Sequence, residues 1–215
     1  MVKMKKQTVR VAIAQINCTV GDLEGNSAKI LQAIKRLEGF GVELVVFPEL
    51  SLTGYPPEDL LLKPKFIEDN LSRIKELAAS IGDVTAVIGF VDKDPCGIFN
   101  AAAVIHNKKI RGVYHKTNLP NYGVFDERRY FAEGKKSLVF GLGKIIAGVN
   151  ICEDIWHKQG PTQKAVRSGA KLIVNINASP YYSGKIKDRE AVILKQAREN
   201  HCFICHANLV GGQDE

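Results

Sequence analysis

Three residues with reactive side chains stand at the ends of predicted strands. The segment ELVVFPE ends at Glu49, KIRGVYHK ends at Lys116, and KIIAGVNIC ends at Cys152. Functional groups in α/β sheets gather at the carboxyl ends of strands, because the strand fixes the residue while the following loop leaves room for a ligand. We therefore expect these three side chains to converge on one pocket.

A carboxylate, an ammonium and a thiol together suit acyl transfer. The thiolate is the nucleophile, yet a free thiol is mostly protonated near neutral pH, so a base or a cation must activate it. Glu49 can act as the base. Lys116 can lower the thiol pKa, or it can join the backbone N–H that follows Cys152 in stabilising the oxyanion formed at a carbonyl or nitrile carbon. Taken singly, Cys152 could equally be a small buried hydrophobic residue, and the two charged residues could be ordinary surface charges.

Strand-like and helix-like segments alternate along the chain. Apolar spacing and end signals predict helices at 26–41, with Asn26 or Ser27 as N-cap, and at 63–82, 158–169 and 185–200. Strands are predicted at 8–16, 43–49, 84–91, 100–107, 109–116, 137–140, 144–151, 171–178 and 203–210, with a hairpin between 100–107 and 109–116. This alternation predicts an α/β sandwich whose helices cover the sheets.

Composition indicates an ordinary globular chain. With 215 residues and 45% hydrophobic content, residues 1–215 are expected to form one domain. The net charge of +7 is spread along the sequence apart from a basic start, with no stripe of Lys and Arg among aromatics, so no nucleic-acid partner is expected. No apolar run approaches the roughly 18 residues of a membrane span, and the one near the start is too short for a signal peptide. Five cysteines, an odd number, fit a reducing compartment, so we expect a cytoplasmic protein.

Three longer segments carry a family resemblance. VVFPELSLTGYPPEDLL (45–61), HKTNLPNYGVFDERRYF (115–131) and GVNICEDIW (148–156) resemble the Glu, Lys and Cys motifs of the carbon–nitrogen hydrolase, or nitrilase, superfamily. The resemblance covers nearly the whole chain and implies a four-layer α-β-β-α sandwich. It also implies that Glu49 is the general base, that Lys116 stabilises the tetrahedral intermediate and that Cys152 is the nucleophile. Glu127 corresponds to the second glutamate of the superfamily, which helps to hold the catalytic groups.

Within the superfamily, LTGYPPEDLL, LPNYGVFDERRYF and NASPYYSGK resemble the glutaminase domains of glutamine-dependent NAD synthetases more than the stand-alone amidases. This branch implies that glutamine is hydrolysed to glutamate and ammonia through a Cys152 thioester. Glu153 would meet the substrate ammonium, while Lys185 and Arg189 are both candidates for its α-carboxylate. The residues that the motif match assigns to the glutamine pocket are Tyr55, Tyr122, Glu153, Ser179, Lys185 and Arg189.

The sequence departs from a complete synthetase in two ways. It contains no SGGxDS-type pyrophosphate loop, and GLGK (141–144) lacks the spacing of a phosphate loop. ATP and deamido-NAD would bind the synthetase domain that carries such a loop, so no cofactor and no metal is expected in this domain. The family's sandwich normally continues for several strands beyond NLVGGQDE, which predicts a truncated domain with an open sheet edge. The resemblance also implies a homo-oligomer.

Other interpretations of the same residues remain open. The chain could be a free-standing ω-amidase or carbamoylase, or a non-catalytic assembly module whose triad is not organised. His157 could form a dyad with Cys152, although the partner in such dyads usually comes from elsewhere in the fold. CFICH (202–206) matches a haem-attachment motif, but alternation along a strand would place Cys202 and Cys205 on opposite faces. The adjacent histidines, His201 and His206, are then expected to be satisfied strand residues.

Overall fold

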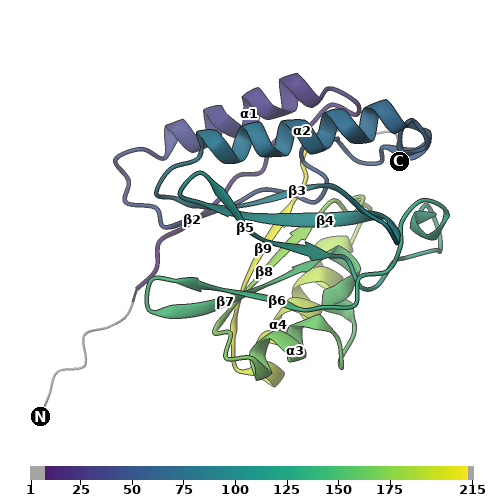
Figure 1. Ribbon diagram of the computed structural model, residues 1–215. Helices are drawn as coiled ribbons and strands as arrows, with labels where there is room; N and C mark the ends of the chain where they lie inside the picture. The colour runs from purple at the N-terminus through teal and green to yellow at the C-terminus, as the bar shows by residue number, and fades with distance from the viewer. Residues whose placement is uncertain (1–7, 213–215) are drawn as a thin grey trace, which may run out of the picture.

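The computed structural model describes residues 8–212 and consists of two stacked sheets between two pairs of helices (Figure 1). The first sheet has the order β1-β2-β3-β4-β5 and the second β6-β7-β8-β9. The strands are β1 (Val11–Ile13), β2 (Leu44–Val46), β3 (Thr85–Asp94), β4 (Gly97–His106), β5 (Lys109–His115), β6 (Leu138–Leu142), β7 (Ile145–Ile151), β8 (Leu172–Asn177) and β9 (Phe203–Asn208). The helices are α1 (Leu23–Arg36), α2 (Pro64–Ser80), α3 (Pro161–Arg167) and α4 (Lys185–Asn200), with short 3₁₀ turns η1 (Glu58–Leu62), η2 (Glu127–Arg129) and η3 (Cys152–Trp156).

Strand direction places several strand ends at the same edge. β1, β2 and β3 run parallel, and β3, β4 and β5 continue the first sheet as antiparallel hairpins. In the second sheet β6 is antiparallel to β7, while β7, β8 and β9 are parallel. Since neighbouring parallel strands end at one edge, the loops that follow β7 and β8 lie close together.

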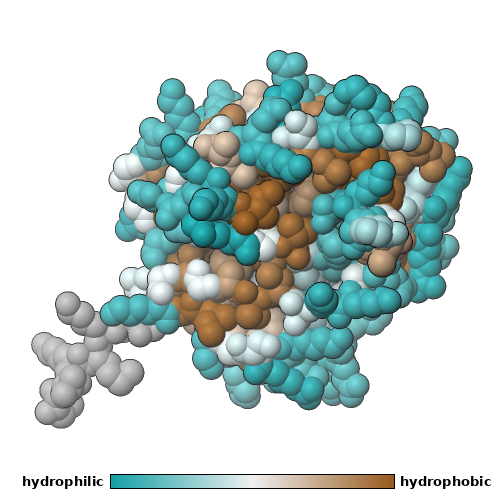
Figure 2. All heavy atoms as spheres, in the orientation of Figure 1, coloured by the Kyte–Doolittle hydropathy of each residue, from teal (hydrophilic) through white to brown (hydrophobic). Residues whose placement is uncertain are grey.

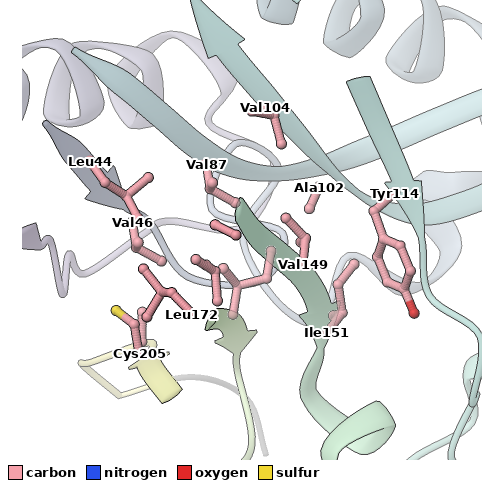
Figure 3. Close-up of a cluster of buried hydrophobic side chains, with 14 of the residues drawn as sticks. Leu44, Val46, Val87, Ala102, Val104, Tyr114, Val149, Ile151, Leu172 and Cys205 are labelled. Atoms are coloured by element: carbon pink, nitrogen blue, oxygen red, sulfur yellow. The ribbon is translucent and has the colours of Figure 1, made fainter. Parts of the chain in front are cut away.

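The core between the sheets is built from alternating apolar residues of both. Leu44, Val46 and Val87 of the first sheet meet Val149 and Leu172 of the second. Each such side chain contributes about 1.5–3 kcal/mol when fully buried. Figure 2 shows hydrophobic side chains gathered at the centre of one face, at the level between the sheets, and Figure 3 shows the packing behind them.

Helices cover the outer face of each sheet. The predicted helical spacing of α2 is confirmed: Ile74, Leu77 and Ala78 are buried in a cluster that also contains Phe47 and Ile88 of the first sheet. On the other side α3 approaches β7 so closely that a Cβ at Gly148 would lie 2.6 Å from the Cβ of Ala165. The predicted four-layer α-β-β-α sandwich is therefore confirmed (Figure 1).

The predicted start of the first helix is wrong. Helix α1 begins at Leu23, and its N-cap is Asp22, whose side chain accepts a hydrogen bond from the Gly25 N–H at 2.8 Å. Asn26 lies inside the helix, where its amide donates to Thr19 O at 2.8 Å and to Leu52 O at 3.1 Å. The side chain that local propensity assigned to the N-cap is therefore hydrogen-bonded to residues outside the helix instead. Strand β1 is also shorter than predicted, and β3 and β4 extend to form a second hairpin.

The CFICH segment shows the predicted separation of its two thiols. Cys205 packs between the sheets and Cys202 lies against the cluster under α3 and α4. Within residues 8–212, no group of three His, Cys, Asp or Glu side chains is placed to hold a metal ion. His201 is not a strand residue as predicted but the C-cap of α4, with a φ of 51°. None of the helices in the described part of the chain is long and apolar enough to cross a membrane.

Candidate active site

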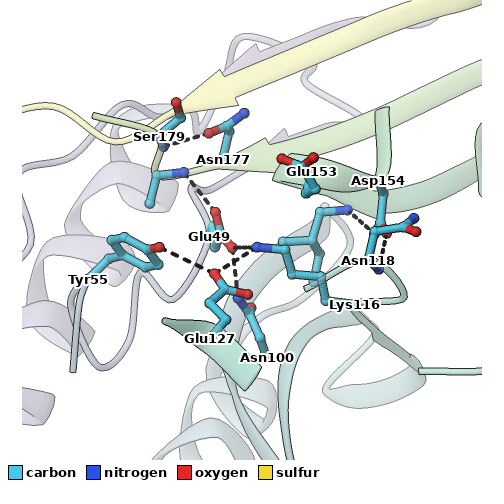
Figure 4. Close-up of polar contacts among 12 residues, drawn as sticks. Glu49, Tyr55, Asn100, Lys116, Asn118, Glu127, Glu153, Asp154, Asn177 and Ser179 are labelled. Carbon is cyan, nitrogen blue, oxygen red and sulfur yellow. Dashed lines mark hydrogen bonds and ion pairs between the residues drawn. The ribbon is translucent and has the colours of Figure 1, made fainter. Parts of the chain in front are cut away.

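The three predicted catalytic residues lie together at the edge where their strands end. Lys116 and Cys152 directly follow β5 and β7, and Glu49 lies three residues beyond β2. All three are buried, with exposed fractions of 0% for Glu49, 1% for Lys116 and 3% for Cys152. Figure 4 shows Lys116 against Glu49 and Glu127, and the charges of Glu49 and Lys116 both act on the Cys152 thiol. The interpretation of Glu49 and Lys116 as surface charges is excluded by their burial.

Both oxygens of the Glu49 carboxylate are held by hydrogen bonds. Oε1 accepts from Lys116 Nζ at 2.7 Å and from Asn100 Nδ2 at 2.7 Å. Oε2 accepts from the Ala178 N–H at 2.9 Å. Gly89 of β3 lies directly against this loop, since a Cβ there would be 2.4 Å from Pro48 O. The carboxylate is thus fixed in one orientation, as a general base requires.

The Lys116 ammonium donates hydrogen bonds to two carboxylates. Lys116 Nζ also donates to Glu127 Oε1 at 2.8 Å, and the Tyr55 hydroxyl donates to the same oxygen at 3.3 Å. Burial disfavours the ammonium, but Glu127 and Glu49 outweigh it and raise the pKa of Lys116. Burial also raises the pKa of Glu127 to about 7, although Lys116 acts in the opposite direction. Lys116 therefore stays charged, and the Glu127 carboxylate takes up a proton as the pH falls through about 7.

The titration of Glu127 predicts a pH-dependent stability. Its folded-state pKa of about 7 lies above the ordinary value of 4.5, so the folded chain binds more protons than the unfolded chain between these values. The resulting stabilisation is fully present below pH 4.5 and is lost as the pH rises through 7, with a slope of up to about 1.4 kcal/mol per pH unit. Glu127→Gln is expected to flatten this slope in denaturant titrations. An equally steep slope in the variant would assign it to other groups.

The nucleophile candidate stands on a strained turn. Cys152 has a φ of 43° between the end of β7 and the first turn of η3, a conformation that costs about 1–3 kcal/mol for a non-glycine residue. Burial raises the pKa of its thiol, the negative charge of Glu49 raises it further, and Lys116 partly offsets both. The thiol is therefore protonated at rest, and an adjacent base must take its proton before it attacks.

Asp154 joins the turn at Cys152 to the loop after Lys116, a role that was not predicted from the sequence. Its buried carboxylate accepts five hydrogen bonds, from Ile151 N at 3.0 Å, Thr117 N at 3.2 Å, Asn118 N at 2.9 Å, Asn118 Nδ2 at 2.9 Å and Tyr114 OH at 2.8 Å. Figure 4 shows it beside Asn118. An acid at the third position of a helical turn often accepts a hydrogen bond from the backbone N–H at the start of the turn, and Asp154 accepts one from Ile151 N in this way. This local pattern could have indicated Asp154 from the sequence. Asn100 was also missed, because nothing local distinguishes it from other strand residues.

This geometry can be compared with known proteins. The model of the carbon–nitrogen hydrolase family matches residues 10–215. The chain belongs to the carbon–nitrogen hydrolase family. It is 46% identical over 210 residues to a glutamine-dependent NAD(+) synthetase of Thermotoga maritima and 43% identical over 211 residues to one of Aquifex aeolicus. These matches cover 96% of this chain and 36% of each relative.

Solved structures agree with this assignment. The glutamine-dependent NAD+ synthetase of Acinetobacter baumannii, in complex with ADP, superposes with a TM-score of 0.92 at 36% identity, over 97% of this carbon–nitrogen hydrolase and 40% of that chain. An amidase from Nesterenkonia sp. superposes with a TM-score of 0.82 at 22% identity and shows the shared fold alone. The predicted family and its sandwich fold are confirmed, and the chain spans well under half the length of the synthetases that it matches.

Opposite charges line a groove that includes Glu153, the residue directly after Cys152. The groove has a volume of about 410 Å³ and is lined by Tyr122, Glu153, Trp156, Tyr182, Lys185, Asp188, Ala191 and Val192. Tyr122 OH donates to Glu153 Oε2 at 2.8 Å. Lys185 Nζ lies over the rings of Tyr182 and Trp156, 4.8 Å and 5.2 Å from their centroids. Glu153 and Lys185 thus present an anion and a cation to one space.

The other predicted pocket residues lie nearer the carboxylate cluster. Tyr55 contacts Glu127, and Ser179 follows Ala178, whose N–H holds Glu49. Arg189 is half-buried, and its Nη2 donates to Ser179 O at 3.1 Å. It does not line the groove that Lys185 lines.

His157 does not take the place of the base. Its Nε2 lies 3.7 Å from Glu153 Oε1 and its side chain is 50% exposed. Glu49, which is hydrogen-bonded to Lys116, is instead the carboxylate whose charge acts most strongly on the pKa of the Cys152 thiol. The arrangement therefore matches a Glu-Lys-Cys site rather than a Cys-His dyad.

Proposed function

We propose that this chain is a glutamine amidohydrolase that releases ammonia through a Cys152 thioester and supplies it to an NAD synthetase domain. The observation that carries the proposal is the buried cluster of Glu49, Lys116 and Glu127 around the strained turn of Cys152. The similarity to glutamine-dependent NAD(+) synthetases supports glutamine as the substrate. ATP and deamido-NAD would bind the synthetase domain and not this one.

Acylation begins with transfer of the Cys152 proton to Glu49. The thiolate attacks the carbon of the glutamine side-chain amide, and the negative charge passes to the amide oxygen. Lys116 Nζ and the Glu153 backbone N–H stabilise this oxyanion, which is the largest electrostatic contribution available at the site. When the intermediate collapses, Glu49 returns its proton to the leaving nitrogen, and ammonia departs from the thioester.

Deacylation reverses these roles with water. Glu49 takes a proton from a water molecule, and the resulting hydroxide attacks the thioester carbon. The second tetrahedral intermediate expels the Cys152 sulfur, which regains the proton held by Glu49, and glutamate is released. Glu127 stays out of the proton transfers and holds Lys116 in place to stabilise the oxyanion through its 2.8 Å bond.

The groove accounts for selection of an amino acid amide. The substrate ammonium would replace the Tyr122 hydroxyl as the partner of Glu153. Lys185 lies in the same groove, so it is better placed than Arg189 to meet the α-carboxylate. A free-standing ω-amidase would have no need of both charges.

Removing one of these charges gives a testable effect. Glu153→Gln is expected to raise KM for glutamine about 10- to 100-fold, because a hydrogen bond to a charged group contributes about 1.5–3 kcal/mol. Alkylation of Cys152 by uncharged iodoacetamide should change little, since it involves neither substrate charge. A variant with normal KM for glutamine would remove Glu153 from the substrate site.

Substrate preference tests the proposed function itself. Glutamate release from glutamine by the 215-residue chain is compared with hydrolysis of simple primary amides that lack the α-amino and α-carboxylate groups. Turnover of glutamine well above that of the simple amides supports the proposal. Equal or better turnover of the simple amides would favour an ω-amidase or carbamoylase, and no turnover of either would favour a non-catalytic module.

A further inference from the structure

A row of polar side chains crosses the outer face of the second sheet, with Asn150 and Asn175 buried and His206 partly buried. Asn150, Asn175 and His206 are register partners on β7, β8 and β9. Ile173 and Ile204, two residues earlier on their strands, pack in the cluster under the helices, and alternation places the three polar residues on the same face. We call this row, with Thr162 of α3 at its end, the polar ladder.

Hydrogen bonds run through the polar ladder in one direction. Asn150 Nδ2 donates to Thr162 Oγ1 at 2.8 Å, and Asn175 Nδ2 donates to Asn150 Oδ1 at 2.8 Å. The Asn175 Oδ1 that remains lies 2.7 Å from His206 Nδ1. An amide oxygen only accepts, so the hydrogen of the neutral imidazole must be on Nδ1. The ladder therefore selects the tautomer of His206 that leaves a lone pair on Nε2.

An arginine donor lies near the lone pair of His206. His206 Nε2 and Arg189 Nε are both buried, and neither has a hydrogen-bond partner among residues 8–212. Asn208 lies two residues after His206 on the same face of β9. Its Nδ2 and Arg189 Nη2 donate to the same oxygen, Ser179 O, at 3.4 Å and 3.1 Å, so the guanidinium lies beside this end of the ladder. Burial and, less strongly, the charge of Arg189 lower the pKa of His206 to about 4. If the ladder ran the other way, His206 would turn an N–H toward a guanidinium that has only donors. The observed direction instead leaves Nε2 as an acceptor beside this group of donors.

Arg189 in turn holds a turn that reaches the catalytic base. Its Nη2 donates to Ser179 O at 3.1 Å, and the preceding residue, Ala178, donates its N–H to Glu49 Oε2 at 2.9 Å. A displaced Arg189 would loosen this turn and remove one of the three hydrogen bonds that orient the Glu49 carboxylate.

We propose that one water molecule joins His206 Nε2 to the Nε–H of Arg189, and that both are positioning residues for the Ala178–Ser179 turn and thereby for Glu49. The inference rests on the proposed function in one respect, the role of Glu49 as base. Arg189 then supports the Ala178–Ser179 turn, and Lys185 is the residue that binds the substrate α-carboxylate.

The first test reads the tautomer directly. Long-range proton–nitrogen correlation spectra of the wild-type chain distinguish a protonated from an unprotonated ring nitrogen in each histidine. We expect His206 to carry its hydrogen on Nδ1 and to remain neutral at pH 6. A hydrogen on Nε2, or a charged ring at that pH, would overturn the proposal whether or not the chain hydrolyses glutamine.

The second test measures the reactivity of Cys152 without a substrate. His206→Asn keeps a donor near the Nδ1 position and removes the Nε2 acceptor, whereas His206→Gln places an amide near Nε2. Iodoacetamide alkylation of Cys152, followed by peptide mass spectrometry, is expected to slow about tenfold in His206→Asn and in Arg189→Ala, a part of the 10²–10⁴ that a general base contributes. His206→Gln should recover most of the rate, and His201→Asn, at the exposed C-cap, should match wild type.

The outcomes separate this inference from the proposed function. Normal alkylation in His206→Asn and Arg189→Ala would overturn the positioning role. Asn208 Oδ1, another buried acceptor without a partner in the described chain, would then be the better candidate to accept from Arg189 Nε. Equal slowing in the Asn and Gln variants would also overturn it, since that points to general disruption. Slow alkylation with the expected rescue supports the inference even if glutamine proves not to be the substrate.

Discussion

Cys152→Ala is expected to reduce glutamate release from glutamine by at least about 10⁴-fold, because loss of a covalent nucleophile removes the whole acyl-transfer route. The fold should persist, since the substitution removes one buried atom and leaves the hydrogen bonds of Asp154 and Glu49 in place. Release of glutamate is measured by a coupled assay, and folding is checked by thermal unfolding of the same sample.

A second buried thiol provides the matched control. Cys205 packs between the sheets, and Cys205→Ala removes the same atom without touching the carboxylate cluster. Its turnover should stay near that of wild type. If Cys152→Ala retained more than about 1% of the activity, the thioester mechanism would be wrong, because the oxyanion donors and substrate binding alone sustain only a small residual rate.

Lys116→Met is expected to destabilise the folded chain by about 3–5 kcal/mol and to abolish turnover. Methionine fills a similar volume but leaves the carboxylates of Glu49 and Glu127 buried without their cation, the situation in which breaking a buried ion pair costs most. The loss should grow as the pH rises above about 7. Lys116 lowers the pKa of Glu127, so without the ammonium Glu127 stays protonated to higher pH, and the repulsion between two ionised carboxylates appears only on the alkaline side.

Urea denaturation at pH 5 and pH 8 measures this effect. Lys65→Met is the matched control, because Lys65 pairs with Asp69 on the exposed surface of α2, where such i,i+4 pairs contribute only about 0.3–0.5 kcal/mol. A loss below about 1 kcal/mol in Lys116→Met would show that the cluster accommodates its carboxylates without the ammonium. The role of Lys116 in holding the site would then have to be abandoned.

The sequence determined the layers of this fold through patterns that are local. Helical spacing predicted α2 within two residues at each end and α4 at both ends, since their apolar faces and end signals are written in consecutive residues. The same holds for the chemical types of Glu49, Lys116 and Cys152, and for their places after strands. Their convergence was predicted from these places, but Glu49 and Lys116 follow strands of the first sheet and Cys152 follows a strand of the second, so the stacking of the two sheets brings them together.

Only the tertiary structure decided how the site is held. Asn100 and the Ala178 N–H reach Glu49 across 51 and 129 residues of sequence, and no local pattern distinguishes them. Asn26 was predicted to be a helix cap, but in the folded chain its side-chain amide donates to Thr19 O and Leu52 O. Lys185 and Arg189 are equivalent in sequence, one helical turn apart. They separate in space because one side chain lies over aromatic rings in the groove while the other turns inward to Ser179, and that choice depends on neighbours that only the packed chain supplies.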